Sequence, residues 1–408
     1  MRIAHVTISH GPLDVRIFHK ECRTLAAAGH DVHLLVPGPT PADSHGVRFH
    51  SLLEVGTSTA YVWSVWRALP SIYRRARRLR AAVYHLPDPS LIPLGLLLKL
   101  RGAKVVYDAH EDRPRQAVTK YRALGRPVVG WVFSLLWRVL EPVAKLSFDR
   151  FVAATPAIAR SFPRGRTTTV CNFPLVEEFS RERPAYRSRP NEIVFTGGIH
   201  TYTGIREAVL AMALLPEGLD ARLAIMGDFC RAYPSFSEEL AELPGWDRVE
   251  YLGPVSRNRM AARLSRARAG LALLSPRPEH LEALGNKKFE YMAAGIPVIA
   301  SDFPLWRSIV RGSGVGLTVD PRSPAEIADA IRYVLEHARE AEAMGERGRR
   351  AVASKYRWEN EAAKLLRLYD GLAYEVEGSL PRRRRSPVGL AEPTDEQAAR
   401  GKPVASEV

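Results

Sequence analysis

Two glutamates eight positions apart, Glu282 and Glu290, stand on either side of a predicted helix start. Glu282 falls in a polar loop and Glu290 in the helix, which Gly295 ends because a left-handed C-terminal position favours glycine. Carboxylates accept hydrogen bonds from vicinal hydroxyls, and a helix start attracts anions through its unpaired N–H groups and its dipole. The pattern therefore predicts a site for a ligand that carries both phosphate and hydroxyl groups.

The junction of loop and helix between the two glutamates holds Asn286, Lys287 and Lys288, and Gly285 precedes them. A lysine and free N–H groups at such a junction can bind phosphate. The run 297–300 that follows the helix is short and β-rich, which is typical of a strand buried on both faces of a parallel sheet. An ordinary helix with solvated acids and lysines is the alternative for each single residue, and the whole pattern is what favours a ligand site.

The stretch from Glu282 to Asp302 resembles the signature of retaining glycosyltransferases of the GT-B fold, the group also called glycosyltransferase family four. That signature has two glutamates separated by seven residues, followed by Ala-Gly-x-Pro-Val-Ile-Ala-Ser, and this chain matches it residue for residue. The resemblance implies that Glu282 contacts hydroxyls of the donor sugar, Glu290 holds the ribose and Lys287 lies near the donor phosphates. It also implies an α/β fold of two Rossmann-like, doubly wound parallel-sheet domains that face a cleft.

The first half of the chain shares the resemblance at its opening. Residues 2–8 alternate like a strand, Gly11 lies in the turn that follows, and 14–28 has the apolar spacing of a helix. This order predicts a parallel sheet whose C-terminal edge admits a ligand at the glycine turn. His110 follows a later predicted strand, and the resemblance implies that it faces the donor sugar and acts with Glu282 in catalysis. A hydrogen-bonded loop histidine is the alternative.

A glycine-rich loop opens the second half, where the predicted strand 192–196 runs into Gly197 and Gly198. Backbone N–H groups of such a loop can bind a pyrophosphate. The family usually places an arginine and a lysine in this loop, and Gly198 and Thr203 hold those positions here. Backbone amides alone could bind the phosphates in place of these two cations, or the loss of the cations could weaken catalysis. The candidate replacement cations are Arg206, His200 and Lys287.

The predicted organisation has an N-terminal Rossmann-like acceptor domain over residues 1–180 and a C-terminal nucleotide-sugar donor domain over 190–355. The polar segment 176–191 is the expected linker. By the resemblance, a helix at 356–376 crosses back to the first domain. Residues 377–408 lack periodicity and hold four consecutive arginines, which predicts a disordered basic tail.

The predicted reaction moves a sugar from a UDP- or GDP-linked donor to an acceptor hydroxyl, and the resemblance implies retention of configuration without a protein general base. The leaving diphosphate needs its negative charge stabilised, and Lys287 and the helix starts can supply that. The sequence has no Asp-x-Asp motif and no histidine–carboxylate cluster with ligand spacing, so neither metal nor cofactor is expected. A glycan, lipid-linked glycan or small molecule is the expected acceptor, in polysaccharide, glycolipid or envelope biosynthesis.

The formal net charge of +15 is uneven, because residues 1–150 carry 22 Lys and Arg against 11 Asp and Glu. A basic half suggests an anionic partner: phosphorylated ligands, nucleic acid or an anionic membrane surface. Residues 59–80 interleave aromatics with arginines and 128–148 form a long apolar helix, which both suit a membrane surface. Helices packed on the sheet are the alternative. No recognised nucleic-acid motif is present, so no specific nucleic acid is expected.

Cysteine usage and apolar runs bear on location. The three cysteines are far apart, without zinc-type spacing, which favours a reduced, intracellular protein. The N-terminus lacks a signal-peptide core, and no run approaches the ~20 apolar residues that span a bilayer. We expect a cytoplasmic protein, with peripheral contact at the inner membrane face as an option.

Two other functions fit parts of the sequence. A GT-B nucleotide-sugar epimerase keeps the fold, but the glutamate pair argues against it. A catalytically degenerate sugar-nucleotide-binding scaffold is motivated by Gly198 and Thr203, where the family has its cations.

Overall fold

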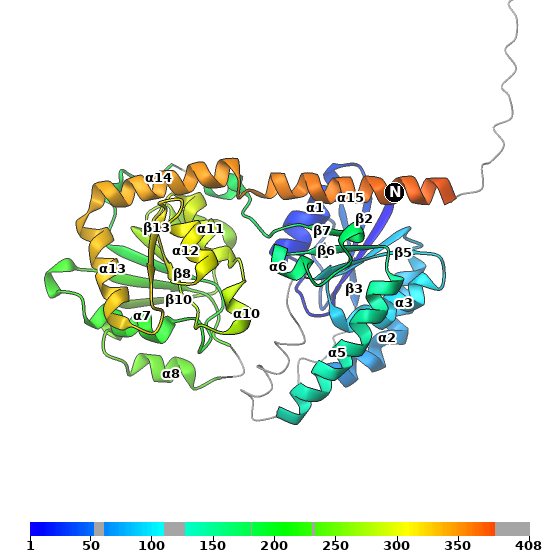
Figure 1. Ribbon diagram of the computed structural model, residues 1–408, viewed down its shortest axis with the longest axis horizontal. Coiled ribbons are helices and arrows are strands. Elements are labelled where there is room, and N and C mark those ends of the chain that lie inside the picture. Colours follow the sequence, from blue (N-terminus) through cyan, green and yellow to red (C-terminus); the bar gives the residue numbers. More distant parts are fainter. Residues whose placement is uncertain (53–60, 110–126, 181, 231–232, 380–408) are drawn as a thin grey trace, which may run out of the picture.

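The computed structural model describes residues 1–52, 61–109, 127–180, 182–230 and 233–379 (Figure 1). Two parallel sheets organise them, with strand orders β3-β2-β1-β4-β5-β6-β7 and β10-β9-β8-β11-β12-β13. Each sheet reverses its strand order once, beside β1 and beside β8. The predicted architecture of two doubly wound parallel sheets is therefore confirmed, and each reversal marks the sheet edge at which such folds bind ligands.

The first sheet holds β1 (Arg2–Val6), β2 (Asp31–Pro37), β3 (Val47–Leu52), β4 (Val83–Leu86), β5 (Lys104–Ala109), β6 (Arg150–Ala153) and β7 (Thr167–Thr169). Ile3 pairs with Val32 on one side and with Val83 on the other, so β1 is central and buried. The covering helices are α1 (Arg23–Ala27), α2 (Tyr61–Arg78), α3 (Ile92–Lys99), α5 (Pro127–Ser147) and α6 (Pro156–Ala159).

The helix predicted over 14–28 begins as a π-helix, η1 (Val15–Cys22), and continues as α1. The Asp14 side chain caps it by accepting hydrogen bonds from the N–H groups of Arg16 and Ile17, both at 2.9 Å. The wider π turn brings side chains five positions apart together, and Arg16 Nε lies 3.1 Å from Glu21 Oε1. π-helical turns are frequent at functional sites, and this one follows the first strand of the sheet.

The second sheet holds β8 (Glu192–Thr196), β9 (Arg222–Met226), β10 (Val249–Gly253), β11 (Ala269–Ala272), β12 (Val298–Ser301) and β13 (Gly316–Val319). Its helices are α7 (Ile205–Ala213), α8 (Phe236–Ala241), α9 (Arg257–Leu264), α10 (Pro278–Leu281), α11 (Asn286–Ala294), α12 (Pro304–Val310), α13 (Pro324–Glu336) and α14 (Ala338–Ser354). Short 3₁₀ turns within the described residues are η2 (Pro89–Leu91), η3 (Arg164–Arg166), η4 (Val176–Phe179), η5 (Tyr186–Ser188), η6 (Glu217–Leu219) and η7 (Trp246–Arg248).

The last helix, α15 (Trp358–Ser379), lies along the first sheet, whereas α14 covers the second (Figure 1). Trp358, Leu365 and Tyr369 are buried in the same apolar core as Ile3 of β1. Trp358 Nε1 also donates a hydrogen bond to Thr24 Oγ1 at 2.9 Å. The chain therefore ends its described part against the domain in which it began. The residue limits given above for the domains stay predictions, and the tail from 380 lies outside the described residues.

Candidate active site

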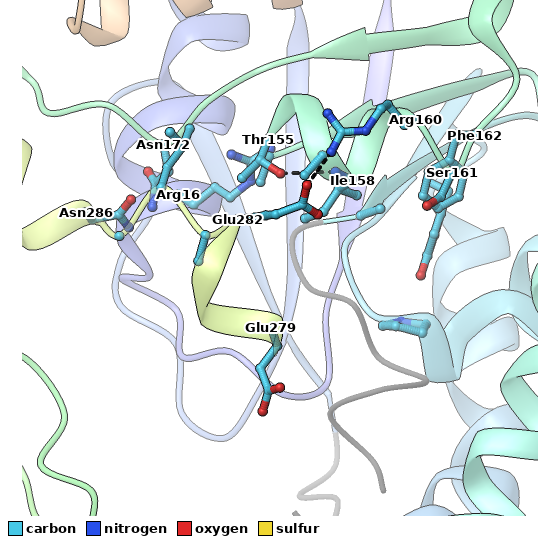
Figure 2. Close-up of a pocket in the computed structure, with 18 of the residues that line it drawn as sticks. Arg16, Thr155, Ile158, Arg160, Ser161, Phe162, Asn172, Glu279, Glu282 and Asn286 are labelled. Carbon is cyan, nitrogen blue, oxygen red and sulfur yellow. Dashed lines mark hydrogen bonds and ion pairs between the residues drawn. The ribbon is translucent and has the colours of Figure 1, made fainter. Parts of the chain in front are cut away.

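A cavity of about 780 Å³ lies between the two halves of the molecule. On the first half its lining follows the C-terminal ends of the strands, with His10 after β1, Pro89 after β4 and Thr155 after β6. The second half contributes the segment between α10 and α11 that contains Glu282 (Figure 2). The cavity is therefore the cleft expected for a GT-B protein, and the glutamate loop forms one of its walls.

Glu282 forms an ion pair across this cavity with a residue of the first half. Its Oε1 accepts a hydrogen bond at 2.6 Å from Nη2 of Arg160, which follows α6 in the first half (Figure 2). Both side chains are largely exposed, and exposed ion pairs contribute little stability. A sugar hydroxyl could therefore replace the guanidinium at small cost. The sequence did not indicate Arg160, because the two residues are 122 positions apart.

The start of α11 has the geometry that the signature predicted. Gly285 has φ of +60°, and a Cβ there would lie 2.9 Å from Cζ2 of Trp306, so both backbone and space require glycine. Asn286 is the first residue of α11, and both residues line the cavity. Gly295 ends the helix with φ of +72°. The unpaired N–H groups of the first turn are therefore placed at the cavity wall.

Lys287 connects this helix start to the glycine-rich loop that follows β8. Its Nζ lies 3.5 Å from the centre of the Phe195 ring at the end of β8. A Cβ at Gly197 would be 3.2 Å from Lys287 Cε, so the lysine lies against the loop. The amine is buried and has no hydrogen-bond partner among the described residues. Burial lowers the pKa of Lys287 to about 7, with Glu290 opposing.

The two positions that lack the family's cations have different surroundings. Thr203 is buried, and its hydroxyl donates to the His200 carbonyl at 2.7 Å, which closes the loop. Gly198 is exposed, and a Cβ there would lie 3.1 Å from Nε2 of His200. Arg206 is exposed on α7 and is absent from the described lining of the cavity. Of the candidate replacements, Lys287 and His200 thus lie against the loop.

Glu290 is held by a second arginine that the sequence did not indicate. Arg257 Nη1 donates to Glu290 Oε1 at 2.7 Å, and Arg257 also pairs with Glu178 of the predicted linker. Burial alone would lower the pKa of Arg257, but the two carboxylates more than offset this and hold its pKa above the ordinary value. Glu290 is mostly buried and is absent from the described lining of the cavity, and its role at the ribose stays a prediction.

Two site residues predicted in the first half, Gly11 and His110, are not among the residues that line the cavity in the described part of the chain. Gly11 is exposed and is absent from the described lining of the cavity, although His10 and Asp14 beside it do line it. His110 lies outside the described residues, and its role stays a prediction. Ala109, which precedes it at the end of β5, lines the cavity.

A buried polar network stands behind the cavity wall. Arg16, which lines the cavity, donates to both carboxylate oxygens of Asp108 at 2.9 and 2.8 Å and to the Val170 carbonyl at 3.0 Å. Burial and Asp108 raise the pKa of Glu21, and Arg16 opposes this shift. Tyr369 of α15 joins through its hydroxyl, 2.7 Å from Nδ1 of His85. The network ties η1, β4, β5 and α15 to one another.

Part of this network could hold a metal ion. His5, Glu21 and His85 are buried and offer ligand atoms that all lie within 4.8 Å of one another. Two ligand atoms bound to one tetrahedral zinc at roughly 2.0–2.2 Å lie about 3.3–3.6 Å apart, and the His–Glu21 separations of 4.0 and 3.7 Å are only slightly wider. Arg16 already lies 3.1 Å from the same carboxylate. The carboxylate thus already has a cationic partner, which favours a buried polar network over a metal centre.

Two family models match the chain in succession. Residues 15–172 match the glycosyl transferase 4-like domain, and residues 176–351 match the glycosyl transferases group 1. The chain belongs to this glycosyltransferase family. The D-rhamnosyltransferase WbpZ of Pseudomonas aeruginosa is 27% identical over 363 residues, 84% of this chain and 86% of that protein. A GDP-mannose-dependent phosphatidylinositol monomannoside mannosyltransferase of Mycobacterium tuberculosis is 41% identical over 85 residues, which is 21% of this chain and 22% of that protein.

Solved structures show the same fold for this glycosyltransferase. Sucrose-phosphate synthase from Thermosynechococcus elongatus superposes with a TM-score of 0.74 at 20% identity, covering 92% of this chain and 99% of that one. WaaG, a glycosyltransferase involved in lipopolysaccharide biosynthesis, gives 0.66 at 16% identity, covering 90% and 99%. The predicted GT-B fold, family and transferase class are confirmed. Retention, the site roles and the lack of a metal requirement stay predictions.

In the described part of the chain, no helix combines the length and the apolar character that crossing a membrane requires. The cytoplasmic location stays a prediction.

Proposed function

We propose that this glycosyltransferase transfers a sugar from a nucleotide diphosphate sugar to an acceptor hydroxyl, with Glu290 holding the ribose and Glu282 the sugar. The observation that carries the proposal is the position of Lys287. This residue belongs to the first turn of α11, and its side chain lies against the glycine-rich loop that follows β8. The buried amine of Lys287 thus lies between two backbone segments of the kind that bind anions, the start of α11 and the glycine-rich loop. This arrangement suits a diphosphate.

In the proposed reaction the bond between the anomeric carbon and the diphosphate oxygen breaks while the acceptor oxygen bonds to that carbon. The acceptor attacks from the face that the diphosphate leaves, which retains the configuration, and its proton passes to the leaving diphosphate, so no protein base is needed. The protonated Lys287 and the first-turn N–H groups of α11 would stabilise the developing negative charge without a metal. Glu282 would orient the sugar and stabilise positive charge at the anomeric carbon, and His110 would contact the sugar from the other half.

Related proteins support the choice of donor and acceptor classes. HepE of Anabaena, with 12% identity and a TM-score of 0.71, was solved with UDP and glucose, and the mycobacterial relative is named as GDP-mannose-dependent. We therefore propose a UDP- or GDP-sugar donor. A glycan or lipid-linked glycan is the proposed acceptor class, with a small molecule as the alternative. We also propose peripheral contact with an anionic membrane on the cytoplasmic side.

A degenerate sugar-nucleotide-binding scaffold is the second candidate, because Gly198 and Thr203 stand where the family has its cations. Calorimetry against UDP-, GDP-, dTDP- and ADP-sugars without metal, followed by a transfer assay, separates the two. The scaffold would bind a sugar nucleotide and show no transfer. Absence of binding to every member would contradict both.

The roles of the two glutamates predict different effects of substitution. Glu290→Ala is expected to weaken sugar-nucleotide binding about ten- to a hundredfold, because charge-assisted hydrogen bonds to the ribose are lost. Glu282→Ala should leave binding within about threefold and lower turnover at least about tenfold. Glu279→Ala is the matched control, since Glu279 also lines the cavity and lies away from Arg160 in Figure 2. Equal losses of binding in the first two variants would contradict the division of roles.

The lowered pKa of Lys287 predicts that donor affinity falls as pH rises. The ammonium form binds diphosphate, and with a pKa of about 7 the free protein loses that proton mainly between about pH 6 and 8. Binding then takes up one proton, so affinity should fall by up to about tenfold per pH unit. Lys20, whose pKa burial also lowers to about 7, titrates in the same window. Calorimetry of Lys287→Met is therefore the control, and a slope that survives in this variant would assign the effect elsewhere.

A further inference from the structure

One helix of the first half exposes a continuous apolar stripe. Trp131, Leu135 and Val139 of α5 are 61%, 64% and 59% exposed, and Val143 and Leu146 continue the row at helical spacing. Successive positions four or three apart lie on one side of a helix. Large exposed apolar patches on a folded domain mark contacts with a partner or a membrane.

The neighbouring helices add exposed apolar and basic side chains beside this stripe. α3 packs against both α2 and α5, and the three helices lie together in Figure 1. α3 exposes Leu97, with Leu100 exposed just beyond its end. The three helices carry five arginines on α2, one lysine on α3 and one arginine and one lysine on α5, against the single acid Glu141. All five α2 arginines are exposed: Arg67, Arg74, Arg75, Arg77 and Arg78. Apolar side chains beside basic ones are complementary to an anionic lipid surface.

We infer that the exposed side of α2, α3 and α5, the docking face, lies on an anionic lipid bilayer with α5 in the plane of the membrane. The stripe would enter the boundary between headgroups and acyl chains, while the arginines contact the anionic headgroups. This inference rests on the membrane contact proposed above and names the surface that makes it. A lipid bilayer is favoured over a second copy of the chain because a second copy would bring like charges together.

The same helix also reaches the candidate active site. Glu141 and Lys145 of α5 line the cavity, as does Ile92 of α3. On α5, Lys145 is next in sequence to Leu146 and Glu141 is two positions before Val143, so both lie on another side of the helix from the stripe. An acceptor anchored in the bilayer under the docking face could therefore present its hydroxyl to the cleft without leaving the membrane.

The test measures co-sedimentation of the full chain with vesicles of phosphatidylcholine alone and with about a third phosphatidylglycerol. The protein should bind the anionic vesicles, and the double variant Leu135→Glu/Val139→Glu should weaken this binding at least about tenfold through lost apolar burial and added negative charge. Leu214→Glu is the matched control, because Leu214 is 57% exposed just beyond α7 in the second half and should not matter. Calorimetric donor affinity of the double variant should equal that of the parent.

Several outcomes would overturn the docking face. Absence of vesicle binding by the parent protein would do so, as would equal binding by the double variant, which would assign the effect to another basic segment such as the C-terminal tail. A parent protein that is dimeric in sedimentation and becomes monomeric in the double variant, without binding vesicles, would assign the stripe to a second copy. Failure of donor binding in the parent protein would contradict the proposed function and leave the vesicle result to stand on its own.

Discussion

Lys287→Met is expected to weaken sugar-nucleotide binding by about ten- to a hundredfold, because a hydrogen bond to a charged group contributes about 1.5–3 kcal/mol. Methionine keeps the apolar contact with the Phe195 ring and removes only the amine. The free protein should lose no stability, since the amine is buried without a hydrogen-bond partner among the described residues. Calorimetry and thermal unfolding of the same sample measure both effects, and unchanged affinity would contradict the role of Lys287.

A second-site substitution makes this test sharper. Gly198→Arg in the Lys287→Met background should restore part of the lost affinity, because it places a cation at the position where the family has its arginine. Gly198 does not have a positive φ, and a Cβ there meets only the His200 ring at 3.1 Å, which can move. Thr203→Lys is the contrasting variant and should not restore binding, because Thr203 is buried and its hydroxyl closes the loop. Restoration by Thr203→Lys alone would refute this account of the loop.

Arg16→Met is expected to lower the free energy of unfolding of the first half by about 3–5 kcal/mol, the usual cost of removing one partner from a buried ion pair. The guanidinium makes two hydrogen bonds to Asp108 and lies 3.1 Å from Glu21, and all three side chains are buried. Methionine would leave two buried carboxyl groups without their cation. Urea unfolding, monitored by tryptophan fluorescence, measures this change in the free energy of unfolding.

The control for this prediction separates charge from packing. Asp108→Asn in the Arg16→Met background removes one of the stranded charges and should recover part of the loss, as a double-mutant cycle would show. Arg307→Met removes a pair with Asp302 that is exposed on the surface, and no measurable shift is expected there. A similar loss in both arginine variants would show that the buried network has no special role.

The signature stretch could be read from the sequence because its signals are local. Periodic apolar residues place Phe289, Tyr291 and Met292 on one side of α11, and all three are fully buried. Gly295 ends the helix in the left-handed conformation, as its position predicted. The long helix predicted at 128–148 is α5, and the strand order follows from alternation of strands and helices. Each of these features depends on residues a few positions apart.

Shorter or less regular elements were not predicted. β3 and β7 lie on the edges of the first sheet, where few neighbours constrain the pattern, and β7 has only three half-buried threonines. The π-helical start of η1 was expected to be an ordinary helix, because apolar spacing alone does not separate the two over eight residues.

The sequence by itself determined the two sheets, the glutamate helix and the absence of the usual cations at Gly198 and Thr203. Only the tertiary structure decided which cations stand near the site: Lys287 at the glycine-rich loop, Arg160 at Glu282 and Arg257 at Glu290. The reason is physical, because parallel strands end at one edge of their sheet and bring their following loops together from distant parts of the chain. The spacing of residues along the sequence therefore does not predict these contacts.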